Sequence, residues 1–112
     1  MAYALALPIP AGKTDAVRDF TAACLGTRQA EFDDMMRRSG LTEESYWLQR
    51  DPQRGALLVV YGREDLAAFL AIMANPQTAF DRWYRNQLMT IFGDDPTADA
   101  GPANEWLGTW TA

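Results

Sequence analysis

The segment Ala56 to Tyr61, with sequence ALLVVY, carries a large apolar side chain at every position from Leu57 onward. Successive side chains along a β-strand point to opposite faces, so Leu57, Val59 and Tyr61 face one way while Leu58 and Val60 face the other. Both faces of such a strand need a cover that excludes water. The segment therefore predicts a strand between two layers, one of which can come from a second chain.

A second strand precedes this one and forms a hairpin with it. Residues Thr42 to Arg50 favour an extended conformation, and the turn-forming sequence DPQRG follows directly. Proline, glycine and aspartate at such a position are typical of a tight turn between antiparallel strands. The first strand of the hairpin places Tyr46 and Leu48 on one face and Trp47 on the other.

The rest of the chain predicts helices before and after the hairpin in sequence, and a strand near each end of the chain. Apolar residues recur at helical spacing from Thr14 to Ser39, which predicts one long helix with a bend or a close packing contact at Gly26. The other expected elements are a strand over Ala2–Leu7, a helix from Arg63 to Asn75, a helix from Thr78 to Phe92 capped by Gly93, a loop over Asp94–Asn104 and a strand over Glu105–Thr111.

This order of elements predicts a single α+β domain over residues 1–112. Strand, helix, strand, strand, helix pair and strand follow one another as in the split βαβ pattern of ferredoxin-like domains. We therefore expect an antiparallel four-stranded sheet with the helices on one face. The opposite face would expose two or three large side chains, which at about 25 cal/mol per Å² costs several kcal/mol. A homodimer formed sheet to sheet removes this cost.

Composition excludes several kinds of partner and cofactor. The net charge is −5, and the Lys and Arg residues are spread along the chain, which argues against nucleic acid. The apolar opening AYALALPIP is far shorter than the roughly 20 residues that span a bilayer, and it lacks the charge pattern of a signal peptide. The single cysteine, Cys24, fits a reducing cytoplasmic setting. Because histidine is absent, we expect no metal and no cofactor.

The phrases SYWLQRDPQRGALLVVYGRED and FDRWYRNQL resemble an uncharacterised family within the dimeric α+β barrel superfamily. That superfamily also contains cofactor-free antibiotic-biosynthesis monooxygenases and stress-responsive barrel proteins. The resemblance implies a ferredoxin-like protomer, a dimer through the sheets and a pocket between sheet and helices. It implies no particular activity. Haem-using branches of the superfamily depend on a histidine that this chain lacks.

Five residues are candidates for a ligand site. Trp47 and Gln49 share a strand face, where an aromatic ring and an amide could stack on and orient a planar ligand, and Tyr61 ends the next strand. On the last helix, Trp83 belongs to an aromatic stripe, and Arg82 could hold a carboxylate. Each residue also has a structural interpretation: Trp47 as core or dimer interface, Gln49 and Tyr61 as ordinary strand residues, Trp83 as core and Arg82 as a solvated cation.

Three functions are compatible with these residues. The leading hypothesis is a small dimeric protein that binds an apolar or aromatic small molecule between sheet and helices. The alternatives are a cofactor-independent monooxygenase-like enzyme acting on an acidic aromatic substrate, with Asn86 as a further amide, and a dimerisation module without a ligand. The acidic pairs Asp33-Asp34, Glu43-Glu44 and Glu64-Asp65 are interpreted as solvated, because adjacent side chains do not converge on one point.

Overall fold

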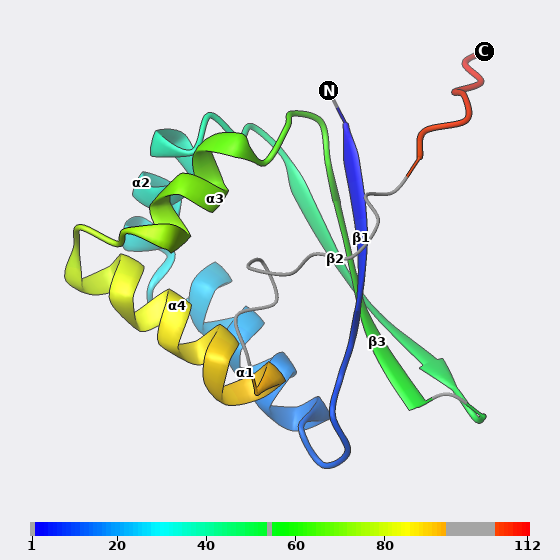
Figure 1. Cartoon of the computed structure of the whole chain (residues 1–112), viewed down its shortest axis with the longest axis horizontal. Coiled ribbons are helices and arrows are strands. Elements are labelled where there is room, and N and C mark those ends of the chain that lie inside the picture. The colour runs from blue at the N-terminus through cyan, green and yellow to red at the C-terminus, as the bar shows by residue number, and fades with distance from the viewer. Residues whose placement is uncertain (1, 54, 94–104) are drawn as a thin grey trace.

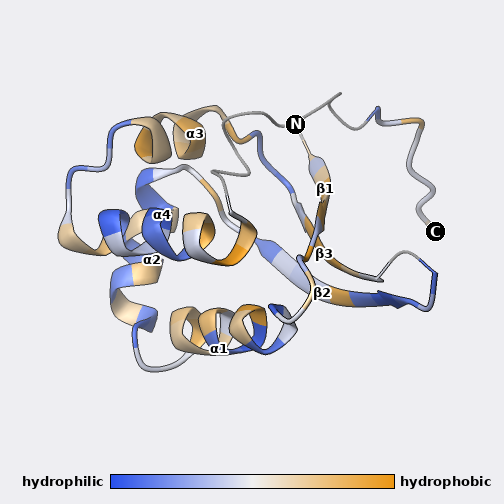
Figure 2. Cartoon of the chain, turned by 60° about the horizontal axis from the view of Figure 1, so that its bottom comes forward, coloured by the Kyte–Doolittle hydropathy of each residue, from blue (hydrophilic) through white to orange (hydrophobic). Residues whose placement is uncertain are grey.

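The computed structural model describes residues 2–53, 55–93 and 105–112 (Figure 1). It is an α+β fold in which all helices lie on one side of a twisted sheet (Figures 1 and 2). The strands are β1 (Tyr3–Pro8), β2 (Glu44–Asp51) and β3 (Gly55–Gly62), and the helices are α1 (Thr14–Leu25), α2 (Gln29–Arg38), α3 (Ala67–Ala74) and α4 (Ala79–Phe92).

Strand β3 is the centre of the sheet, with β1 and β2 antiparallel to it on either side. The predicted hairpin is confirmed, since β2 and β3 pair from Glu44–Gly62 to Asp51–Gly55. At the turn, the Asp51 carboxylate accepts a hydrogen bond from the Gln53 backbone N–H at 2.9 Å, as turn aspartates commonly do.

The register divides the strands into a face toward the helices and an outer face. Leu58 and Val60 of β3 are buried at 7% exposure each, and Leu5 and Tyr46 pair with Val60 from either side. Side chains that pair directly across strands lie on the same face of the sheet. Leu5, Val60 and Tyr46 thus form one row beneath the helices, and the neighbouring β3 residues Leu57, Val59 and Tyr61 point outward.

The expected four-stranded sheet is wrong: the described residues form a three-stranded sheet with four helices. The predicted fourth strand, Glu105–Thr111, has no regular structure, and residues 105–112 are all exposed. Within this segment the Trp106 indole N–H donates a hydrogen bond to the Thr109 hydroxyl, three residues along the chain. Alternation shows which face a segment could bury, but a strand also needs an edge to pair with, which a short pattern does not supply. The predicted loop Asp94–Asn104 lies outside the described residues.

The single long helix over Thr14–Ser39 is also wrong, because the chain breaks after Leu25 into α1 and α2. The break lies at Gly26, where the glycine N–H and the Arg28 N–H both bond to the Ala23 carbonyl. A Cβ at Gly26 would lie 2.7 Å from the Ala22 carbonyl oxygen, so this geometry requires glycine. The sequence indicated a bend or a close packing contact here but not a break into two helices.

The helices and the sheet enclose an aromatic core. Phe20 of α1, Phe32 of α2 and Phe80 and Tyr84 of α4 are all buried, and the centre of the Tyr84 ring lies 4.9–6.2 Å from the centres of the other three rings. The prediction for α4 is confirmed, since Thr78 caps its start and Gly93, at φ 84°, ends it in the left-handed conformation that glycine favours.

Candidate functional site

The outer face of the sheet is open and apolar. Trp47 of β2 is 58% exposed and Tyr61 of β3 is 44% exposed, and their rings stack at 6.5 Å with an interplanar angle of 12°. Gln49 lies on the same face, opposite Leu57, and is also exposed. Three of the predicted site residues thus share one surface, which faces away from the helices.

Trp83 and Arg82 lie elsewhere, on α4 on the opposite side of the sheet. Trp83 is half-buried between Phe20 and Phe80, and the Arg28 guanidinium lies 4.2 Å from its ring centre in a cation–π contact. Arg82 is exposed. The structure therefore does not bring Trp47 and Trp83 together around one pocket within the protomer.

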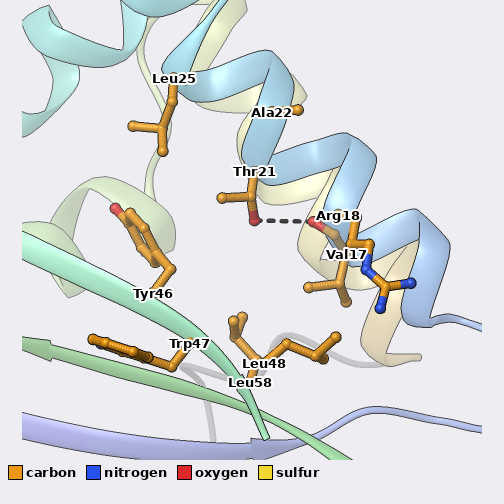
Figure 3. A pocket seen from close by; sticks show the side chains of 9 residues that line it. All are labelled: Val17, Arg18, Thr21, Ala22, Leu25, Tyr46, Trp47, Leu48 and Leu58. Carbon is orange, nitrogen blue, oxygen red and sulfur yellow. Dashed lines mark hydrogen bonds between the residues drawn. The ribbon is translucent and has the colours of Figure 1, made fainter.

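A groove of about 310 Å³ lies between α1 and the edge strand β2 (Figure 3). Helix α1 contributes one wall, and Tyr46, Trp47 and Leu48 of β2 contribute the other, with Leu58 of β3 at the base. The α1 residues are Val17, Arg18, Thr21, Ala22 and Leu25. Edge strands leave such a groove because no further strand covers them. A volume near 300 Å³ and an apolar lining are within the range of small-molecule sites.

A carboxylate lies beside this groove, on the helix-facing side of the sheet. Glu44 accepts a hydrogen bond from the Tyr46 hydroxyl at 2.5 Å and a second, short one from the Tyr3 hydroxyl. Tyr3, Gly62 and Glu44 form one row across the three strands. Because glycine has no side chain, the Tyr3 ring crosses β3 over Gly62 and reaches β2; a Cβ there would lie 2.6 Å from the Tyr3 oxygen.

The neutral form of the Glu44 carboxyl is more favourable in this environment than it is in water. Burial raises the pKa of this carboxyl above its usual value, and the two phenol hydrogen bonds oppose the rise. Burial, together with the nearby carboxylate, also raises the pKa of Tyr46 and of Tyr84. These phenols therefore remain protonated at neutral pH. Among the described residues, no cation pairs with Glu44.

Sequence reasoning missed this cluster, because it assigned Glu43 and Glu44 together to solvent. In the structure only Glu43 is exposed, and its carboxylate pairs with Arg63, whereas Glu44 points under the helices. The available signal was Gly62, a glycine at the end of a strand of large residues. Such a glycine indicates close approach by a neighbour, but only the register shows that the neighbour is Tyr3.

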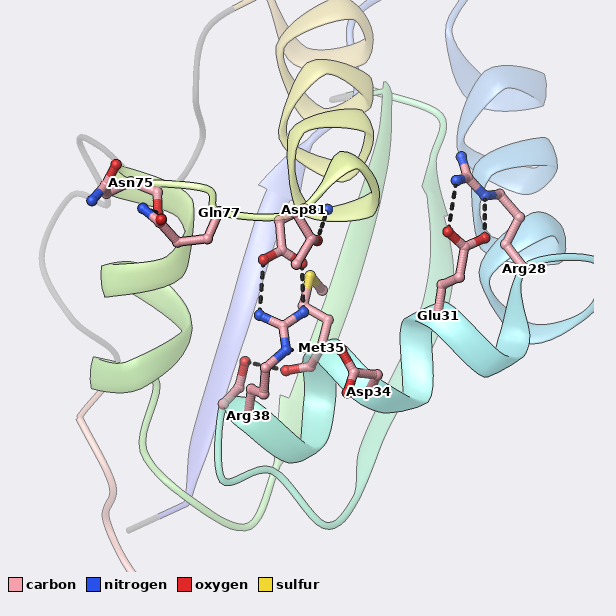
Figure 4. A network of polar contacts seen from close by, with 10 residues as sticks. Arg28, Glu31, Asp34, Met35, Arg38, Asn75, Gln77 and Asp81 are labelled. Carbon is pink, nitrogen blue, oxygen red and sulfur yellow. Dashed lines mark hydrogen bonds and ion pairs between the residues drawn. The ribbon is translucent and has the colours of Figure 1, made fainter.

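A fully buried carboxylate joins two helices (Figure 4). Asp81 of α4 has no exposed surface, and the Arg38 guanidinium of α2 donates to both of its oxygens, at 2.7 and 2.8 Å. Arg38 also bonds to the exposed Asp34 at 2.9 Å. The guanidinium holds the pKa of Asp81 below its usual value. Because both oxygens are occupied, we assign this pair to stability and not to chemistry.

Comparison with protein-family models, with curated proteins and with solved structures finds no match. In the part of the chain that the structure describes, no helix is both long and apolar enough to cross a bilayer. The described residues also contain no cluster of three or more Cys, Asp or Glu side chains with the geometry to hold a metal ion. The function must therefore be argued from the site itself.

Proposed function

We propose that this protein binds an apolar or aromatic small molecule in the groove between α1 and β2. The observation that carries the proposal is the groove itself, because its walls are mainly aliphatic and aromatic side chains. A ligand that covers the apolar side chains of this groove would gain roughly 25 cal/mol for each Å² of apolar surface removed from water.

Filling the groove from α1 should abolish binding. Ala22 is exposed and lines the groove, so Ala22→Phe would occupy the ligand's volume with little disturbance of the core. We expect its affinity for naphthalene derivatives, measured by isothermal titration calorimetry, to fall at least tenfold, roughly the contribution of one well-packed ring.

Ala30→Phe is the matched control, because Ala30 is an exposed alanine on α2 and does not line the groove. This variant should bind as the wild type does. If Ala22→Phe and Ala30→Phe bind equally well, the ligand lies elsewhere. If wild-type protein binds no aromatic compound at millimolar concentration, the proposed function is wrong.

We also propose that two copies associate through the outer face of the sheet. The stacked Trp47 and Tyr61 rings and the half-buried Leu57 and Val59 form a contiguous apolar surface on β2 and β3. Small alanines on β1, Ala4 and Ala6, extend it as a flat region opposite Tyr61 and Val59. A surface of this kind supports sheet-to-sheet packing, in which apolar side chains from both copies interdigitate.

A charge at the centre of this face should separate the copies. Val59 lies between Ala6 and Trp47 in the middle strand, so Val59→Lys would place two ammonium groups close together in a symmetric interface. We expect the dimer dissociation constant, measured by sedimentation velocity, to rise by at least a hundredfold, because each copy would bury an unpaired charge. Ala68→Lys on α3, an exposed helix position, should leave association unchanged. A wild-type chain that sediments as a monomer over a roughly 100-fold range of concentration centred on about 100 μM would contradict the proposal.

A further inference from the structure

Two of the side chains that line the groove, Thr21 and Tyr46, carry a hydroxyl group, and each hydroxyl donates its proton to an acceptor within the protein. The Thr21 hydroxyl donates to the Val17 carbonyl at 2.9 Å, one turn back along α1 (Figure 3). The Tyr46 hydroxyl donates to the Glu44 carboxylate at 2.5 Å. A hydroxyl that donates its one proton still has lone pairs, so in these hydrogen bonds each oxygen retains acceptor capacity only.

The hydrogen bonds that the Thr21 and Tyr46 hydroxyls donate differ in strength. Threonine in a helix commonly bonds to the carbonyl four residues back, and this neutral bond can be exchanged by rotation of the hydroxyl. The bond from Tyr46 is assisted by the charge of Glu44, and such bonds are roughly twice as strong as neutral ones. Glu44 also receives the Tyr3 hydroxyl, which fixes its orientation. Tyr46 is therefore the better defined acceptor.

The other polar groups among the lining side chains are the indole N–H of Trp47, whose ring lies on the outer face of the sheet, and Arg18, which lies at the rim of the groove. The Arg18 side chain is 46% exposed and already pairs with Asp15 at 2.9 Å. An exposed, paired cation contributes little to the affinity for an anion, because water and the existing partner compete with it. The interior of the groove therefore presents hydrogen-bond acceptors and apolar surface to a ligand.

From these contacts we propose that the ligand is a neutral aromatic compound with a hydroxyl or amino group, and that this group donates a hydrogen bond to the Tyr46 oxygen. The proposal rests on the proposed binding function and adds the chemical class of the ligand. Glu44 acts as a positioning residue, because it touches Tyr46 and not the ligand. The corresponding methyl ether or carboxylate would bind less well, since neither can donate to Tyr46 at neutral pH.

Three compounds with one ring system separate the possibilities. 2-Naphthol carries a donor, 2-methoxynaphthalene has the same ring and oxygen without a donor, and 2-naphthoate carries a negative charge. By calorimetry with wild-type protein, we expect naphthol to bind about five- to tenfold tighter than the ether, the effect of one net hydrogen bond. Naphthoate should bind more weakly than naphthol.

Two variants test the acceptor, with one matched control. Tyr46→Phe removes the oxygen and should bring the naphthol-to-ether affinity ratio close to one. Glu44→Gln removes the charge that holds the Tyr46 proton and should lower the same ratio. Tyr61→Phe also removes one phenol oxygen, but on the outer face, and should keep the wild-type ratio. Because each ratio is measured within one variant, a general loss of affinity or stability does not change it.

The outcomes distinguish this inference from the binding function beneath it. Equal binding of naphthol and its ether to wild-type protein, or a ratio unaffected by Tyr46→Phe, overturns the ligand class and leaves the proposed function in place. Tighter binding of naphthoate than of naphthol also overturns the ligand class and assigns the recognition to Arg18. If none of the three compounds binds, both the proposed function and the ligand class are wrong.

Discussion

Replacing Arg38 by alanine should destabilise the protein by about 3–5 kcal/mol, the range for removing one partner of a buried ion pair. The reason is asymmetry of burial: Asp81 has no exposed surface, whereas the Arg38 side chain is 34% exposed. Without the guanidinium, the carboxylate stays in the interior with neither of its oxygens paired to a cation. Urea unfolding followed by circular dichroism measures the free energy of unfolding directly.

Asp34→Ala is the matched control, because it removes a contact of the same arginine. The Arg38–Asp34 bond involves a carboxylate that is 65% exposed, so its loss should cost less than about 1 kcal/mol. Equal losses in Arg38→Ala and Asp34→Ala would show that the arginine stabilises α2 locally and not through Asp81.

The same pair sets a pH dependence with a defined sign. In the wild type the folded pKa of Asp81 is depressed, so the pair stabilises the protein above the unfolded value of about 3.9, and the effect is lost as pH falls through the folded pKa. In Arg38→Ala, burial without a cation should instead raise the pKa of Asp81. The difference in unfolding free energy between the two proteins should therefore be largest near pH 7 and narrow below about pH 4.

Gly62→Ala should destabilise the protein by about 2–3 kcal/mol, near the upper range for overpacking. The new methyl group would lie 2.6 Å from the Tyr3 oxygen, 2.7 Å from the Tyr3 ring and 2.7 Å from the Glu43 carbonyl oxygen. Of these atoms only the tyrosine can move, and in moving it would leave Glu44. Thermal unfolding of the variant should show a lower midpoint than that of the wild type.

A double-mutant cycle identifies the cause of that loss. In a Tyr3→Ala background the ring is absent, so Gly62→Ala meets only the Glu43 carbonyl and should cost about 1 kcal/mol less than in the wild type. An identical cost in both backgrounds would mean that Gly62 is required for the backbone alone. The Tyr3–Glu44 contact would then be a consequence of the fold and not a reason for the glycine.

Local patterns predicted the local elements well. The apolar strand residues of Glu44–Asp51 and Gly55–Gly62, with turn residues between them, specify a hairpin, and the periodicity of Ala79–Phe92 specifies a helix with identifiable caps. These elements depend on contacts between residues close in sequence. At Glu105–Thr111, by contrast, alternation predicted a strand that the structure does not form.

The candidate site was predicted only in part. Trp47, Gln49 and Tyr61 share a face because residues two apart on a strand do so, and because the hairpin register aligns Tyr61 with Ser45. The sequence predicted Trp83 in the same site because both regions are rich in aromatic residues. Residue type, however, carries no information on which side of the sheet α4 packs. The groove itself is formed by α1 and β2, elements separated by all of α2.

The sequence by itself determined the two-sided apolar strand, the hairpin and the amphipathic helices, because each follows from side-chain spacing along a few residues. Only the tertiary structure decided what covers each face of β3: helices over Leu58 and Val60, and open surface over Val59 and Tyr61. It also decided that Tyr3 passes over Gly62 to reach Glu44. Contacts of this kind join residues about 40 positions apart, and their register depends on the packing of the whole sheet, which no local pattern specifies.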